Sequence, residues 1–376
     1  MAQLQGRFVA LDAATGRIAW ARRFPGRCAA ASPAVWHGVV YEPYIPAPCD
    51  YGPRNRPSFL VAMNARTGRI LWRYWAGSSE SSPLLVNGIV YFGAWDRNVY
   101  ALDVRTRALR WRFTTDAEID SSPAYAGGTI YIGTNGGRVY ALDARTGHQR
   151  WVFGDGREYF YATPTLAYGR VYIGNTDGTL YALGARTGDV LWVQRVGTYV
   201  YTSAAAWGGM VYVGSYDGSF NAYDAATGGL RWHFDAPAAV HGAPVVMDGL
   251  VYFSTCAYCG SRGSRYAKRG PRNTYALDAR TGRLVWTAPG VGTYSPIVAD
   301  GRRVYLLGRA QVFGLRPVSR TAGAPRSATE RRPARVGPSR TDDERRETIR
   351  LSGAVRRASR GRSPIGRFGN GSADRP

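Results

Sequence analysis

A tryptophan recurs along this chain about every forty residues, and this repeat constrains the fold more than any other feature. The seven positions are Trp20, Trp72, Trp111, Trp151, Trp192, Trp232 and Trp286. A period of 20–50 residues is typical of architectures built by stacking one small unit many times. The chain is therefore expected to consist mainly of copies of a single supersecondary unit.

Each unit is predicted to contain four short antiparallel strands, here called A, B, C and D. Residues 141–147 read Ala-Leu-Asp-Ala-Arg-Thr-Gly before Trp151, and related phrases precede the other tryptophans. Asp143 can cap the turn between strands C and D, and Gly147 can adopt a positive φ. Strand A follows a Ser-Pro or Thr-Pro step. Strand B reads Gly-x-Val-Tyr, and an Asp-Gly or Asn-Gly pair marks the turn that follows it.

These units predict an all-β fold, a β-propeller over residues 1–316. A single four-stranded sheet cannot bury both faces, but several sheets packed radially can. The seven tryptophans then fill the wedges between neighbouring sheets as structural residues. The sequence contains seven C–D pairs, seven A–B pairs and one further strand at 311–315. Eight blades with incomplete terminal blades are favoured, and seven blades are the alternative.

The repeated phrase resembles that of the pyrroloquinoline-quinone repeat family, within the quinoprotein alcohol dehydrogenase-like superfamily. The resemblance covers residues 7–315 and includes the Val-Tyr-x-Gly strand and the Asp-Gly turn. It implies a propeller, and it leaves function open because the family contains both dehydrogenases and non-catalytic propellers such as the outer-membrane assembly lipoprotein.

A dehydrogenase of this family would need calcium ligands, a catalytic aspartate and often two adjacent cysteines. The chain has no adjacent cysteine pair, and most of its carboxylates are the repeated turn aspartates. We therefore predict no catalytic residue, no metal site and no cofactor. Pyrroloquinoline quinone with calcium is expected only if the chain is a dehydrogenase after all.

The four cysteines are expected to lie on one rim of the ring. Cys28 and Cys49 flank or occupy a Pro-rich insertion at 42–58, and Cys256 and Cys259 occupy a second insertion at 254–272. Disulfides Cys28–Cys49 and Cys256–Cys259 are the leading interpretation, which would indicate an oxidising compartment. A redox Cys-x-x-Cys pair and a four-cysteine zinc site are the alternatives.

The candidate binding residues occupy one position of the repeat, three residues before the Pro of strand A. Strand A is the innermost strand, so this register is expected to line the mouth of the central channel. Polar and aromatic groups that converge at a concavity indicate a ligand-binding site. A structural role in holding the loops and blades together is the alternative. Ala30 occupies the register in the first copy, and the other members are Glu80, Asp120, Tyr161, Tyr201, His241 and Thr293.

The net charge of +23 does not indicate specific nucleic-acid binding. Lys268 is the only lysine, and the arginines form no long cluster before residue 317. Residues 317–376 are rich in Arg, Ser, Gly and Pro, and we expect them to form a disordered tail. No stretch is long and apolar enough for a transmembrane helix. The first residues show no signal peptide, and the chain begins in the middle of a unit, which suggests a start inside a longer gene.

Three functions follow from these observations. The first is a non-enzymatic propeller that binds a protein, peptide or small ligand on one rim. The second is a quinone-dependent dehydrogenase, and the third is the extracytoplasmic sensor portion of a larger receptor. An extracytoplasmic, monomeric protein is the expectation in the first case.

Overall fold

The computed structural model of the chain comprises two units, residues 1–323 and 324–376. All described residues belong to the first unit. They are residues 7–47, 57–154, 156–257, 265, 267–291, 297–301, 303–307 and 312–315. The predicted disorder of residues 317–376 therefore lies outside the described residues.

The described elements are antiparallel β-strands, and six sheets contain all four strands in the order A-B-C-D. Sheet 2 consists of β4 (Ala34–Trp36), β5 (Val39–Pro43), β7 (Pro57–Asn64) and β8 (Ile70–Gly77). Sheet 3 consists of β9 (Leu84–Val86), β10 (Ile89–Gly93), β11 (Asn98–Asp103) and β12 (Leu109–Thr114). Sheet 4 consists of β13 (Ala124–Ala126), β14 (Thr129–Gly133), β15 (Val139–Asp143) and β16 (Gln149–Phe153). Sheet 5 consists of β17 (Thr165–Ala167), β18 (Arg170–Gly174), β19 (Thr179–Gly184) and β20 (Val190–Arg195). Sheet 6 consists of β21 (Ala205–Trp207), β22 (Met210–Gly214), β23 (Ser219–Asp224) and β24 (Leu230–Asp235). Sheet 7 consists of β25 (Val245–Met247), β26 (Leu250–Ser254), β27 (Asn273–Asp278) and β28 (Leu284–Pro289).

The first and last sheets are shorter within the described residues. Sheet 1 has strands C and D alone, β1 (Arg7–Leu11) and β2 (Ile18–Arg23). Sheet 8 has strands A, B and C, β29 (Val298–Ala299), β30 (Val304–Leu307) and β31 (Val312–Leu315). A small ribbon of β3 (Arg27–Cys28) and β6 (Ile45–Pro46) lies at the insertion in sheet 2.

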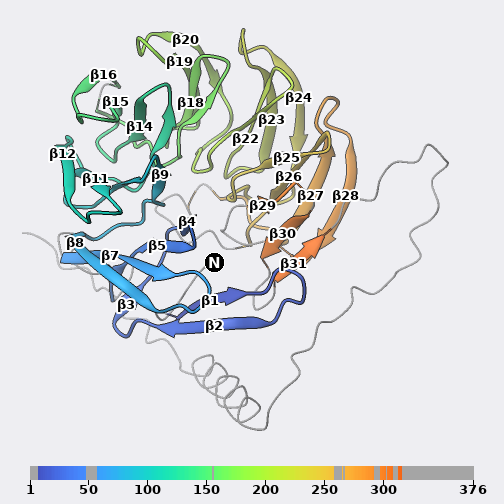
Figure 1. Cartoon of the computed structure of the whole chain (residues 1–376). Helices are drawn as coiled ribbons and strands as arrows, with labels where there is room; N and C mark the ends of the chain where they lie inside the picture. The colour runs from blue at the N-terminus through green and yellow to red at the C-terminus, as the bar shows by residue number, and fades with distance from the viewer. Residues whose placement is uncertain are drawn as a thin grey trace, which may run out of the picture. The chain divides into compact units, whose positions relative to one another are not determined.

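The sheets follow one another around a ring in chain order, and β31 lies beside β1 (Figure 1). The guanidinium of Arg303 in sheet 8 donates a hydrogen bond to the carbonyl oxygen of Ala13 in sheet 1, with an N–O distance of 2.6 Å. The all-β propeller prediction is confirmed. The eight-bladed count stays a prediction. A seven-bladed closure would place β29, β30, β1 and β2 in one sheet, whereas β30 pairs with β31 and sheet 1 is separate.

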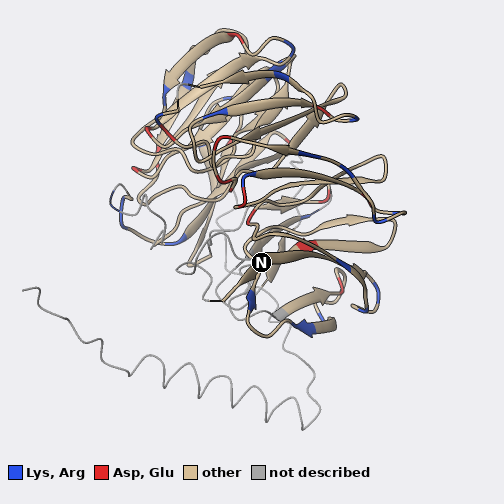
Figure 2. Ribbon diagram, turned by 90° about the vertical axis from the view of Figure 1, so that its left-hand side faces the viewer, with Lys and Arg blue, Asp and Glu red and all other residues tan. Residues whose placement is uncertain are grey.

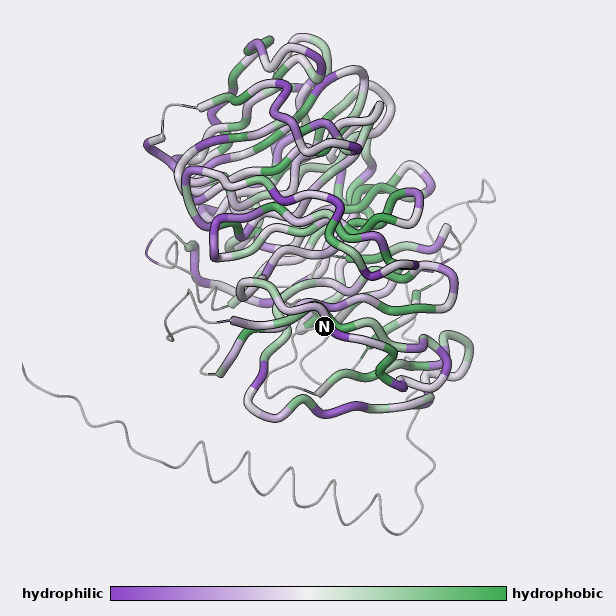
Figure 3. The backbone as a smooth tube through the Cα atoms, turned by 60° about the vertical axis from the view of Figure 1, so that its left-hand side comes forward, coloured by the Kyte–Doolittle hydropathy of each residue, from purple (hydrophilic) through white to green (hydrophobic). Residues whose placement is uncertain are grey.

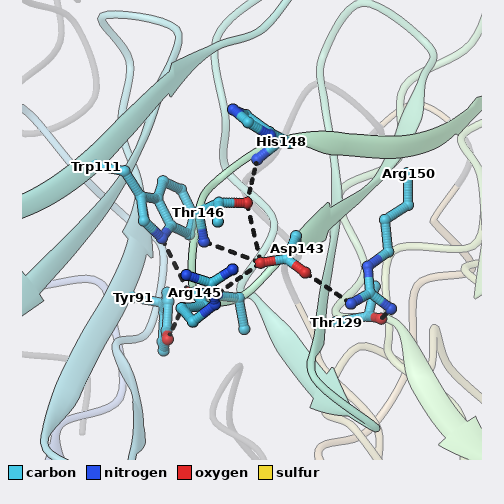
Figure 4. Close-up of polar contacts among 9 residues, drawn as sticks. Tyr91, Trp111, Thr129, Asp143, Arg145, Thr146, His148 and Arg150 are labelled. Carbon is cyan, nitrogen blue, oxygen red and sulfur yellow. Dashed lines mark hydrogen bonds and ion pairs between the residues drawn. The ribbon is translucent and has the colours of Figure 1, made fainter.

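The turns form for the reasons that the sequence indicates. Gly127 and Gly128 both have positive φ and join strands A and B of sheet 4 in a tight hairpin. In the C–D turn of the same sheet, Asp143 Oδ1 accepts the backbone N–H groups of Arg145 and Thr146 at 3.0 and 2.9 Å. Side chains from sheet 3 contact this turn, as Figure 4 shows for Trp111 and Tyr91.

Neighbouring sheets are joined by a hydrogen-bonded motif that recurs around the ring. The indole N–H of Trp151 and the hydroxyl of Tyr131 in sheet 4 both donate to the carbonyl oxygen of Ala185 in sheet 5, at 3.0 and 2.9 Å. The same indole bond recurs in the pairs Trp20–Ala65, Trp111–Ala144, Trp192–Ala225 and Trp232–Ala279. Each bond connects the D strand of one sheet to the C–D turn of the next.

Apolar layers between the sheets form the core. The hydrophobic stretches of the chain lie mainly in strands, and hydrophilic residues concentrate in turns (Figure 3). Trp111, Trp151, Trp192 and Trp232 are buried, and Trp20 and Trp72 are half-buried. Trp286 differs from the prediction because it is 37% exposed. Its sheet faces sheet 8, whose described residues include no C–D turn to cover the ring.

The repeated turn aspartates should make stability depend on pH in the acid range. The backbone N–H of Thr106 and the guanidinium of Arg110 lower the pKa of Asp103 to about 2. Since the unfolded pKa is about 3.9, this stabilisation is present above pH ~4 and is lost as the pH falls to ~2. Urea denaturation of wild type and Asp103→Asn should therefore show a shallower loss of stability in the variant over this window. Equal pH slopes for the two proteins would contradict this role.

Candidate functional site

The predicted register residues lie in the connections that lead from strand D of one sheet to strand A of the next. Glu80 follows β8, Asp120 precedes β13, Tyr161 precedes β17, Tyr201 precedes β21 and His241 precedes β25. Each of these five residues is half-buried. Ala30 is exposed, and Thr293 lies outside the described residues.

The aromatic members of the register form one cluster. The ring of Tyr201 lies 5.3 Å from that of Tyr161 and 4.7 Å from that of His241, measured between centroids. Tyr216 stacks on His241 at 5.6 Å and lies 5.0 Å from Tyr199. The aromatic side chains beside sheets 5, 6 and 7 thus form one continuous cluster, in which Tyr199 and Tyr216 are buried and the three register residues are half-buried.

The acidic members of the register lie near this cluster. Burial raises the pKa of Tyr201, and the negative charge of Glu80 raises it further, followed by the charges of Tyr216 and Asp120. Because these charges act on one hydroxyl, carboxylates from the connections before sheets 3 and 4 converge with aromatic rings from sheets 5 to 7. The structure therefore brings five of the six predicted residues into one neighbourhood.

Asp120 is held by groups from two adjacent sheets. The indole of Trp95 in sheet 3 donates to Asp120 Oδ1, and the side-chain amide of Asn135 in sheet 4 donates to Asp120 Oδ2 at 2.8 Å. The other amide atom, Asn135 Oδ1, is buried and has no hydrogen-bond partner. A carboxylate beside an orphaned carbonyl oxygen is an acceptor set suited to a cationic donor.

Sequence reasoning missed a second register that completes this rim. It consists of the second residue after strand B in sheets 3 to 7, and its members are Trp95, Asn135, Thr176, Tyr216 and Cys256. Their backbone N–H groups donate to the D–A connection of the same sheet, as in Tyr216 to the carbonyl of Tyr199 at 3.0 Å. Aligning the residues after Val-Tyr-x-Gly would have revealed this set, because unlike side chains occupy an otherwise regular position.

The cysteines lie partly outside the described residues. Cys28 and Cys256 are buried, and neither is a free thiol. Cys256 packs in the aromatic cluster with Tyr199 and Tyr216. Cys49 and Cys259 are not among the described residues, so the pairings Cys28–Cys49 and Cys256–Cys259 stay predictions.

The described residues do not fit the calcium site of a quinoprotein dehydrogenase. No three of their His, Cys, Asp and Glu side chains lie close enough together to hold a metal ion. The main acidic groups instead cap turns or accept indole and amide donors, as Asp143 and Asp120 do. The absence of a cofactor nevertheless stays a prediction.

The charges of the described unit are dispersed. In the view of Figure 2, the Lys and Arg residues are scattered over the strands and turns, and Asp and Glu residues lie among them. Several arginines are paired with turn aspartates, as in Arg110–Asp103 and Arg231–Asp224, both at 2.6 Å. In the part of the chain that the structure describes, no helix is long and apolar enough to cross a membrane.

The chain matches one family model in four overlapping segments, residues 1–94, 54–152, 95–206 and 196–330. That model describes the outer membrane protein assembly factor BamB. No curated protein matches the sequence.

Solved structures with the same fold include BamB and two dehydrogenases. BamB from Moraxella catarrhalis has a TM-score of 0.65 at 19% identity, over 82% of this chain and 89% of that one. A europium-containing methanol dehydrogenase has a TM-score of 0.59 at 15% identity, over 80% and 78%. The quinohemoprotein alcohol dehydrogenase ADHIIG from Pseudomonas putida HK5 has a TM-score of 0.53 at 16% identity, over 75% and 63%. At these identities the likeness shows the fold alone.

Proposed function

Because the chain belongs to the family of the outer membrane protein assembly factor BamB, we propose that it is a non-enzymatic propeller that binds a partner protein at one rim. The partner presents a lysine or arginine side chain to the acidic and aromatic surface formed by Glu80, Asp120, Tyr161, Tyr201 and His241. The observation that carries this proposal is the convergence of the two carboxylates with a cluster of half-buried aromatic side chains.

This surface has the chemistry of cation recognition. A carboxylate with charge-assisted hydrogen bonds attracts a guanidinium or ammonium group, and aromatic faces attract the same cations through the ring quadrupole. The orphaned Asn135 Oδ1 offers a further acceptor. The chain as a whole has a net charge of +23 and therefore repels basic groups. A local acidic rim attracts them, so basic groups are directed to this one surface.

The proposed location is extracytoplasmic. The family is described by an outer-membrane assembly factor, and the cysteines at Cys28 and Cys256 are not free thiols. Disulfides persist in oxidising compartments, so the predicted pairs with Cys49 and Cys259 agree with this location. We expect a monomer, because the ring buries its apolar layers within one chain.

Binding of labelled peptides by fluorescence anisotropy tests the rim. Glu80→Gln combined with Asp120→Asn should weaken binding of a peptide array's Lys- and Arg-containing members by about tenfold or more. The amides preserve size, and the amide oxygen introduced by Asp120→Asn can still accept the Trp95 indole bond. Asp189→Asn combined with Asp248→Asn removes the same charge from exposed turns between strands C and D and between A and B. Equal losses of peptide affinity in the two double variants would show that the effect comes from net charge alone, and would contradict the rim site.

The dehydrogenase and receptor-sensor alternatives give different results. Addition of pyrroloquinoline quinone, calcium and an alcohol or sugar would produce dye reduction if the chain were a dehydrogenase. A sensor portion of a larger receptor would bind a small ligand at the rim without a preference for basic peptides.

A further inference from the structure

A pocket of about 420 Å³ lies between sheets 3 and 4. Every residue of both sheets is described, so the walls of the pocket are complete. They come from the A–B hairpins of the two sheets, the C–D turn of sheet 4 and both D strands. The rim of the proposed function is formed by the D–A connections, at the other ends of the strands. The pocket is therefore a separate feature, and its volume lies in the range of small-molecule sites.

At other interfaces an aromatic side chain of the A–B hairpin reaches across to the next sheet. In sheet 6 the last residue of strand A is Trp207, whose ring centroid lies 5.5 Å from the guanidinium carbon of Arg280 in sheet 7. In sheet 5 the next position along the hairpin holds Tyr168, whose hydroxyl accepts the backbone N–H of Gly209 in sheet 6 at 2.9 Å. These two positions of the repeat thus cover the interface when they hold a large ring.

Sheet 3 has small residues at both of these positions. They are Val86 and Asn87, and both line the pocket. Neither can extend across the interface as a tryptophan or tyrosine does, so the space between the two sheets stays open. The same is true of sheet 4, which has Ala126 and Gly127 there. The difference between the two interfaces lies in their charges.

Three arginines line the pocket between sheets 3 and 4. Arg110 and Arg150 directly precede the repeated tryptophan of their sheets, and Arg145 lies in the C–D turn of sheet 4. Among the seven described D strands, sheets 3 and 4 are the only neighbours that both have arginine before the tryptophan. In sheet 5 that position is Leu191. The open interface with three cations is therefore specific to sheets 3 and 4 in the described part of the ring.

Two of the three guanidinium groups are neutralised by turn aspartates. Arg110 pairs with Asp103 at 2.6 Å, and Arg150 pairs with Asp143 at 2.7 Å (Figure 4). Arg145 is exposed, and its guanidinium has no ion pair or hydrogen bond within the residues that the structure describes. The pocket therefore has an excess of one positive charge, and that charge belongs to Arg145.

The rest of the lining is apolar or donates hydrogen bonds. Val86, Ile89 and the rings of Tyr91 and Tyr125 form the apolar walls. The hydroxyl of Tyr91 is already used, since it donates to the carbonyl oxygen of Ala144 at 3.0 Å. The half-buried hydroxyl of Tyr125 has no hydrogen-bond partner in the described chain and remains available as a donor. A bare inorganic anion would leave the apolar walls in water, whereas an anion with an apolar body covers them.

We propose that this pocket binds a small-molecule carboxylate with an apolar or aromatic body. The carboxylate accepts hydrogen bonds from the Arg145 guanidinium, and the body lies against Val86, Ile89 and Tyr125. A charge-assisted pair with an otherwise unpaired guanidinium supplies the preference for an anion, and the apolar walls supply the preference for a ring or chain. The site does not depend on the rim of the proposed function, so either can fail alone.

Two matched probes test the pocket with the full chain. 2-Naphthoate presents a carboxylate on an aromatic body, and 2-naphthamide has nearly the same shape without the charge. By isothermal titration calorimetry, 2-naphthoate should bind wild type about tenfold more tightly than the amide. Arg145→Gln should abolish this preference. Arg186→Gln is the matched control, because Arg186 is exposed at the same turn position in sheet 5, and it should leave the preference unchanged.

A second variant tests the location by filling the pocket. Val86→Trp introduces the residue that sheets 2 and 6 already have at this position, Trp36 and Trp207, so the hairpin accepts it. The variant should bind neither probe. Its far-UV circular dichroism and melting temperature should match those of wild type, which shows that the loss comes from the filled space.

Other results would overturn the proposal. Equal affinities of the two probes for wild type, or no binding of 2-naphthoate, would show that no carboxylate site is present. Equal losses in Arg145→Gln and Arg186→Gln would assign the preference to net charge. Binding of 2-naphthoate that persists in folded Val86→Trp, or that is lost in Glu80→Gln with Asp120→Asn, would place the probe outside the pocket. The last result would leave the proposed function of the rim intact.

Discussion

Replacement of Trp151 by alanine is expected to lower the free energy of unfolding by about 3–5 kcal/mol. The ring is 8% exposed, lies 5.7 Å from the ring of Tyr131, and donates its indole N–H to Ala185 in the next sheet. The substitution removes the apolar contact and the hydrogen bond between two sheets together. Urea denaturation followed by far-UV circular dichroism measures the effect.

The matched control is Trp286→Ala, at the same point of the repeat in sheet 7. Trp286 is 37% exposed, and no indole bond to a following C–D turn is present among the described residues. Its replacement should cost about 1 kcal/mol, the usual magnitude for a partly exposed side chain. If the two variants lost stability equally, the tryptophans would not act through the interface between sheets.

The repeat made most of the fold predictable because each unit contains the residues that determine its own strands and turns. The glycine pairs, the turn aspartates and the strand B tyrosines all produce the elements expected of them. Tertiary context was then needed only to place identical sheets side by side. The terminal sheets differ, since Arg303 donates to Ala13 at the point where five other interfaces have a bond from a tryptophan indole. The repeat pattern does not predict that an arginine takes the place of the tryptophan there.

The candidate site was only half predictable for the same reason. Alignment of the repeats predicts that Glu80, Asp120 and Tyr201 lie on one rim. Residues at the same position of each repeat must lie at the same height along the axis of the ring. Sequence alignment does not show which of them touch. The contacts of Asp120 with Trp95 and Asn135 depend on how one sheet is rotated against the next.

The pocket between sheets 3 and 4 shows the converse case. The small residues Val86 and Asn87 are visible in the sequence once the A–B hairpins are aligned. The unpaired state of Arg145 is not visible there, because Asp143 could pair with either Arg145 or Arg150. The structure supplies that second observation. Deviations from a repeat therefore locate candidate functions, and the surrounding contacts decide among them.

Gly147→Ala is expected to destabilise the chain by about 2–5 kcal/mol. Gly147 closes the C–D turn of sheet 4 with φ +76°, and a Cβ there would lie 2.7 Å from Cδ2 of Trp111 in sheet 3. The cost combines the strain of a left-handed backbone with the displacement of a buried ring. Gly169→Ala is the matched control, because its φ is +71° and no atom lies within 4 Å of the new Cβ. That variant should lose only about 1–2 kcal/mol.

The residue at the equivalent point of sheet 3 supports the distinction between strain in the turn and steric conflict with the facing tryptophan. Arg107 adopts φ 64°, so the turn itself accepts a side chain. Trp72, the tryptophan facing that turn, is only half-buried, and no hydrogen bond joins it to Val104 in the described part of the chain. The steric conflict can be isolated with a double-mutant cycle. In a Trp111→Ala background, Gly147→Ala should cost no more than Gly169→Ala does in wild type, because the ring that it displaces is gone. An undiminished cost in that background would assign the whole effect to the turn and would remove the glycine from the interface between sheets.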